Sequence, residues 1–85
     1  MRIKFSAAAI VDFRDIAPAA PLFWQRLQSL SEDPLQFRKR NDLFPGCRIA
    51  SHRHEVILFR IQQDQLEVVR IIHRNLTPHS HAKRY

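Results

Sequence analysis

The strongest constraint on the fold is a pair of apolar segments separated by only four residues. Residues 54–61 and 66–72 are rich in β-branched and aromatic side chains, which favour β-strands. The four residues 62–65 between them suit a turn, so we expect an antiparallel hairpin in which Ile61 pairs with Leu66. In this register Arg60 faces Glu67, a complementary cross-strand pair.

Both faces of this hairpin are apolar, so both need cover. One face carries Ile57, Phe59, Ile61, Leu66 and Val68, and the other carries Val56, Leu58, Val69 and Ile71. Leu58 is expected to lie opposite Val69. Two short helices can cover the first face. We expect the second face to be covered by the tail after His73 or by another chain, because a bare apolar sheet face is a liability in so small a protein.

The N-terminal part of the chain predicts a short strand and two helices. Polar and apolar residues alternate over residues 2–5, and Ser6 suits the N-cap of a helix that Pro18 ends. Pro21 suits the first turn of a second helix, which should end near Pro34. Trp24 and the apolar stripe of this second helix are assigned to the core, with the stripe against Ile57, Phe59 and Val68; the stripe consists of Phe23, Leu27 and Leu30.

These elements predict an α+β fold in which two N-terminal helices pack on a small antiparallel sheet of three or four strands. Residues 35–46 read as a loop, and residues 47–51 as a further strand. The 85 residues make one domain, 1–85. The longest apolar runs, 7–11 and 56–59, are far below the roughly 20 residues of a membrane span, and no secretory signal is evident. We therefore expect no membrane partner.

The single cysteine, Cys47, excludes an internal disulfide and fits the reducing cytoplasm, where we expect the chain to act. A lone cysteine on a predicted strand is usually a small buried hydrophobic residue, and we assign that role to it. With one glycine there is no phosphate-binding glycine loop.

The positive charge is concentrated in the second half of the sequence. The net charge is +6, yet residues 1–37 hold four basic and four acidic side chains, whereas residues 38–85 hold ten and four. Such a basic half favours an acidic partner, which can be nucleic acid, the ribosome or an acidic protein. The alternative is a basic surface that serves only solubility.

Metal and acid–base chemistry find little support in the sequence. The His52/His54 and His79/His81 pairs could each supply two metal ligands, but two ligands do not make a site. We therefore expect no metal and no cofactor. Asp12 and Asp15 are expected to be solvated on the outside of a helix. Arginines with a histidine or tyrosine remain; such a set can cleave RNA without a metal or can simply bind.

The order of several short motifs resembles the RelE/ParE superfamily of bacterial toxins, and the second half resembles its ParE branch. The carrying segments are FSAAAIVDF at 5–13, DLFPGCR at 42–48, HEVILFR at 54–60, VVRIIHR at 68–74 and PHSH at 78–81. They follow the family's strand-to-helix opening, its Pro-Gly turn and its two closing strands. The chain departs from typical members in a shorter helical pair, around residues 17–21.

This resemblance implies the toxin of a type II toxin–antitoxin system, a protein that is not an enzyme, inhibits DNA gyrase and is neutralised by a cognate antitoxin. The expected target-binding residues are His73, Arg74, Lys83 and Arg84. The expected antitoxin-binding residues are Arg48, Val56, Leu58, Arg60, Val69 and Ile71.

Two alternatives stay open. A RelE-like relative would be an endonuclease that cuts mRNA on the ribosome, with Arg48, Arg70, His73 and Tyr85 as its catalytic set. The other alternative is an inactive homologue that only binds antitoxin.

Overall fold

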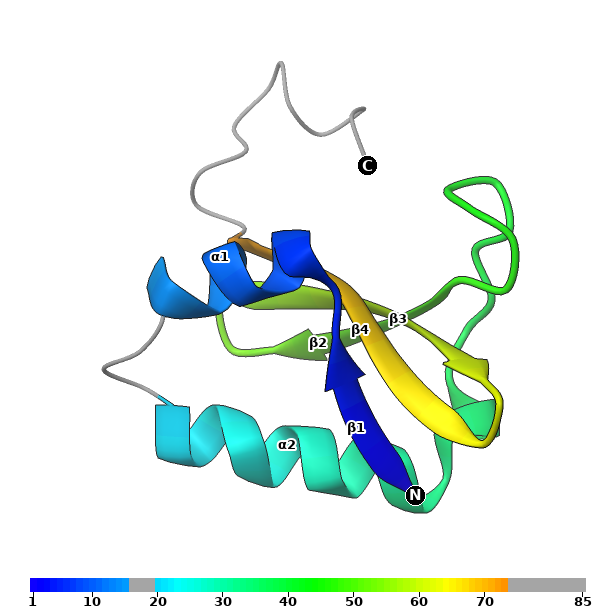
Figure 1. The fold of residues 1–85 in the computed structure, drawn as a ribbon, viewed down its shortest axis with the longest axis horizontal. Coiled ribbons are helices and arrows are strands. Elements are labelled where there is room, and N and C mark those ends of the chain that lie inside the picture. The colour runs from blue at the N-terminus through cyan, green and yellow to red at the C-terminus, as the bar shows by residue number, and fades with distance from the viewer. Residues whose placement is uncertain (16–19, 74–85) are drawn as a thin grey trace.

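The computed structural model describes residues 1–15 and 20–73, and these form an α+β domain (Figure 1). In chain order the elements are β1 (Arg2–Phe5), α1 (Ala7–Asp15), α2 (Ala20–Glu32), the 3-10 helix η2 (Pro34–Gln36), β2 (Arg48–His52), β3 (Glu55–Gln62) and β4 (Gln65–His73). The expected strand, helical pair, loop and strand series is therefore confirmed, with element ends shifted by one or two residues. Pro18 lies outside the described residues.

The four strands form one mixed sheet in the order β1-β4-β3-β2. The β2–β3 and β3–β4 pairs are antiparallel, but β1 runs parallel to β4, with Arg2 opposite Gln65 and Phe5 opposite Val68. A wholly antiparallel sheet was expected. The parallel pair is possible because both helices, the loop and the β2–β3 hairpin separate β1 from β4, which is ample chain for a crossover.

The register of the β3–β4 hairpin is confirmed at the turn and wrong beyond it. Ile61 pairs with Leu66 and Arg60 with Glu67, as expected. After the Phe59–Val68 pair the register shifts, so that Leu58 lies opposite Arg70. Val69 is the additional residue of a β-bulge, and it exchanges the faces of every β4 side chain that follows.

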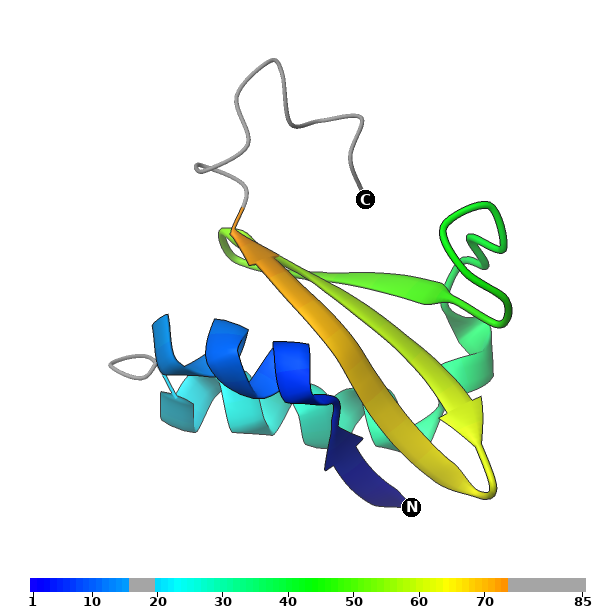
Figure 2. The same ribbon diagram turned by 45° about the horizontal axis from the view of Figure 1, so that its top comes forward.

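The main core lies between the two helices and one face of the sheet (Figure 2). The stripe of α2 is fully buried there together with Ile57, Phe59 and Val68, as expected. Because of the bulge, Ile71 also belongs to this cluster, not to the opposite face. Ser6 caps α1: its hydroxyl oxygen accepts the Ala9 N–H at 3.0 Å.

The second face of the sheet is covered by the chain's own loop. We call residues 37–47 the covering loop. Its Leu43, Phe44 and Cys47 pack with Val56 and Leu58 in a second apolar cluster. The basic loop before β2 thus supplies cover for this face that the sequence analysis did not foresee; the tail, which was also expected there, lies outside the described residues.

Candidate functional site

Three arginines of the described chain are held by carboxylates. Arg60 contacts Glu67 at 2.7 Å, which confirms the internal pair considered for it, and Arg40 contacts Asp42 at 2.8 Å. Arg70 lies on β4 and donates two hydrogen bonds to Asp12 of α1, at 2.8 and 3.1 Å. This contact raises the pKa of Arg70 above its usual value. These three guanidinium groups have structural roles.

Asp12 is not the solvated carboxylate that was expected. Its side chain is only 13% exposed, and besides Arg70 it accepts the backbone N–H of Ile71 at 2.9 Å. Strand β1 pairs only with residues 65–68 of β4, so Asp12 satisfies a donor on the part of the β4 edge that β1 does not reach. The carboxylate anchors α1 to the sheet.

The histidines gather at one end of the β3–β4 hairpin. His73 Nε2 lies 3.8 Å from Glu55, and its ring stacks on that of His54 at 6.0 Å between centroids. Among the described residues no group of three or more metal-ligating side chains converges, and His79/His81 lie outside them. His52 packs against Phe23, and burial lowers its pKa below the usual range.

Three of the four residues of the nuclease alternative lie within the described residues, and they do not converge on one site. Arg48 lies opposite Phe59, whereas His73 lies opposite Glu55, four residues along β3. That separation is about 13 Å along the strand. Arg70 is turned to α1 by Asp12. Tyr85 lies outside the described residues.

The other expected site residues are placed only in part. His73 ends β4, but Arg74, Lys83 and Arg84 lie outside the described residues. Of the expected antitoxin contacts, Val56, Leu58 and Ile71 are buried within this chain, whereas Val69 is half-buried at the bulge. Their assignment to an antitoxin stays a prediction. Cys47 is buried as expected, and burial raises the pKa of its thiol.

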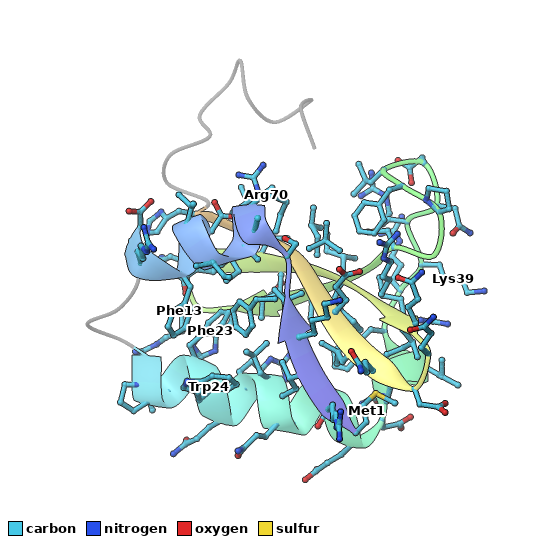
Figure 3. All side chains as sticks on the ribbon, viewed as in Figure 1. Met1, Phe13, Phe23, Trp24, Lys39 and Arg70 are labelled. Carbon is cyan, nitrogen blue, oxygen red and sulfur yellow. The ribbon has the colours of Figure 1, made fainter. Side chains whose placement is uncertain are left out.

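An exposed apolar patch was missed by the sequence analysis. Phe5, Ile10, Phe13 and Trp24 line an open pocket between β1, α1 and α2, which we call the aromatic patch. Trp24 was assigned to the core, yet it is 42% exposed and lies edge-on to Phe5 at 5.8 Å. Figure 3 shows Trp24 on α2, near Phe13. The available signal was that Ile10 and Trp24 lie outside the buried stripes of their helices.

Two arginines contact the backbone near β2, the strand at the edge of the sheet beyond β3: Arg48, which the sequence analysis assigned to antitoxin binding, and Arg26, which it did not single out. Arg48 donates from Nη1 to the carbonyl oxygens of Leu35 and Phe37, at 3.2 and 2.8 Å. Arg26 of α2 reaches the same strand, where its Nε donates to the Ser51 carbonyl at 3.1 Å.

No described helix is long and apolar enough to cross a membrane.

Comparisons with known proteins agree with this architecture. A family model described as the ParE toxin of the type II toxin–antitoxin system parDE matches residues 3–76. Among solved structures, a chain of the chromosomal ParDE system from P. aeruginosa has a similar fold. The TM-score is 0.69 at 18% identity, and the match covers 86% of this chain and 95% of that chain. Comparison with curated proteins gave no match.

Proposed function

Because this chain belongs to the ParE family, the toxins of type II toxin–antitoxin systems, we propose that it inhibits DNA gyrase in the cytoplasm and that a cognate antitoxin neutralises it. Family membership over residues 3–76 is the observation that carries the proposal. The geometry supports binding over chemistry, since Arg48 and His73 lie apart and Arg70 is held by Asp12.

The residues proposed to bind the target are His73 and the basic residues that follow it in the sequence, Arg74, Lys83 and Arg84. In the sequence they add positive charge at and after the end of β4, and both described apolar clusters lie within residues 1–73. We propose that they contact gyrase or the DNA that gyrase holds.

The antitoxin is proposed to cover the aromatic patch as well as the arginines assigned to it from the sequence. Two exposed apolar side chains, Ile10 and Trp24, beside the half-buried rings of Phe5 and Phe13 favour a partner on this surface. The net charge of +6 favours an acidic antitoxin segment. Arg60 contributes less than its charge suggests, because Glu67 already pairs with it.

The test compares two targets with the same purified chain. We expect inhibition of gyrase supercoiling, with mRNA left intact in a translation extract. The His73→Ala variant should lose a binding contact and so weaken inhibition several-fold. Codon-dependent cuts in ribosome-bound mRNA that vanish in His73→Ala or Tyr85→Phe would instead establish the RelE-like nuclease, for which loss of an acid or base lowers the rate about 100-fold or more.

Deletion of residues 74–85 tests the proposed target-binding segment. We expect the shortened chain to fold, because both described apolar clusters lie within residues 1–73, and to lose growth inhibition on induced expression. The matched control replaces Arg2, Lys4 and Arg14 by glutamine, which removes three positive charges from exposed positions elsewhere. Growth arrest by the shortened chain would contradict the role of the segment.

A further inference from the structure

Four arginines follow the outer edge of β2, and we call them the β2 stripe: Arg26, Arg38, Arg48 and Arg53. The Ile49 N–H donates to the Arg38 carbonyl at 3.1 Å, which places Arg38 beside Ile49. Arg26 is bonded to Ser51, and Arg53 follows directly after the strand. Arg38 and Arg26 therefore meet β2 at positions two residues apart, which is about 7 Å along the strand.

The β2 stripe differs from Arg40, Arg60 and Arg70 in its partners. Arg40, Arg60 and Arg70 each contact a carboxylate. Within the part of the chain that the structure describes, no stripe arginine forms an ion pair with a carboxylate. Their positive charge therefore remains available to an anionic ligand.

Two members of the stripe are held in place before any ligand arrives. The Arg26 guanidinium lies over the Phe37 ring, 5.5 Å from its centroid, while its Nε binds Ser51. Arg48 uses one nitrogen, Nη1, for two carbonyl oxygens of the segment before the strand. Both guanidinium groups keep further N–H donors, and binding would cost little side-chain entropy because the side chains are already ordered.

We propose that the β2 stripe binds the phosphate backbone of duplex DNA. Guanidinium groups bind phosphates in a bidentate manner, and a row of them suits a ligand with regularly repeated anions. Binding of single strands usually requires exposed aromatic platforms for the bases. The aromatic residue of this surface, Phe37, instead has a guanidinium over its ring. The choice of DNA over RNA as the ligand rests on the proposed function, because gyrase acts on DNA. The row of positive charges is present whether or not gyrase is the target.

The experiment measures binding of the full chain to a labelled 20-base-pair duplex of random sequence, by fluorescence anisotropy over a series of salt concentrations. The test variant is Arg38→Gln/Arg53→Gln, which removes the two exposed members and spares Arg26 and Arg48. Arg2→Gln/Arg14→Gln removes the same charge from exposed positions of β1 and α1. We expect the test variant to bind about tenfold more weakly, with a salt slope smaller by about 1.8, and the control to stay within about twofold.

A conservative variant separates charge placement from folding. Arg38→Lys/Arg53→Lys keeps both charges and should bind within about threefold of the natural chain. Equal losses in the test and control variants would overturn the stripe, because net charge alone would then explain binding. Stripe-dependent binding that is tighter for single-stranded RNA or for polyglutamate than for the duplex would also overturn it. Gyrase is absent from this assay, so its outcome is independent of whether gyrase is the target.

Discussion

The Asp12 side chain accepts three hydrogen bonds that connect α1 to β4. It binds the Arg70 guanidinium with both carboxylate oxygens and also accepts the Ile71 N–H, next to the bulge. Its position on α1 gave no sign of this role, since the partner lies 58 residues away in the sequence. Helical periodicity reports which face a residue occupies, not which distant backbone donor lies there.

Replacing Asp12 with alanine should lower the free energy of unfolding by about 2 kcal/mol, because it removes hydrogen bonds to a charged group and leaves the Ile71 N–H without its acceptor. Asp12→Asn keeps an acceptor for that N–H and should lose less. The control is Asp15→Ala, an exposed position on the same helix, expected to change stability by under about 0.5 kcal/mol. Urea unfolding measures all three; equal effects at both positions would refute the anchoring role.

His52 should make stability depend on pH. Burial, aided by Arg53 and Arg26 and opposed by Glu55, lowers the pKa of His52 in the folded chain below its usual value of about 6.5. Since the unfolded chain then binds more protons, the free energy of unfolding should fall as the pH drops through about 6.5. We expect a shallower fall between pH 7 and 5 in His52→Gln. Parallel pH curves for the two chains, from urea unfolding, would contradict this effect.

At the scale of a single element, β4 shows which strand pairings can be predicted from the alternation of residue types and which cannot. The turn, the Ile61–Leu66 pair and the Arg60–Glu67 pair follow from residue types at short range, and all were predictable. The bulge at Val69 was not, because nothing in the residue types marks it. Ser6 donates its N–H to the Val68 carbonyl and its hydroxyl to the Val69 carbonyl, and these contacts come from the other end of the chain.

Because of the bulge, two alanine substitutions on β4 should lower the free energy of unfolding by unequal amounts. Ile71→Ala should lower the free energy of unfolding by about 3 kcal/mol, because Ile71 lies in the main core. Val69→Ala should cost under about 1 kcal/mol, since Val69 is half-buried and belongs to neither apolar cluster. Chemical denaturation of both variants gives the comparison. A larger loss at Val69 would mean that the strand continues without the bulge.

For the molecule as a whole, the fold class and the core stripe of α2 were predictable from apolar periodicity, but the surface was not. Cover for the second sheet face was expected from the tail after His73 or from another chain, whereas the covering loop contributes it through Leu43 and Phe44. Conversely, Trp24 was placed in the core, whereas the shortness of β1 and α1 leaves it at a rim. Which apolar surface stays open depends on how long the neighbouring elements are.

Trp24 offers a direct test of the proposed antitoxin surface, because it is the only tryptophan in the chain. If the antitoxin covers the aromatic patch, its binding should shift the tryptophan emission to shorter wavelength, with an antitoxin segment that itself lacks tryptophan. Trp24→Ala should weaken binding at least tenfold. Leu35→Ala, a more exposed apolar position outside the patch, serves as control. An unchanged spectrum in the complex would exclude the patch as the docking surface.

The pairing of β1 with β4 has a consequence for synthesis of the chain. Strand β1 is made before the rest of the described sheet, yet the strand beside it spans residues 65–73 and is the last of the described strands to be made. The described sheet therefore cannot close before residues 65–68 have been translated, and contacts that span more than 60 residues slow folding through their loop entropy. A nascent chain would hold β1 without its partner strand until that point.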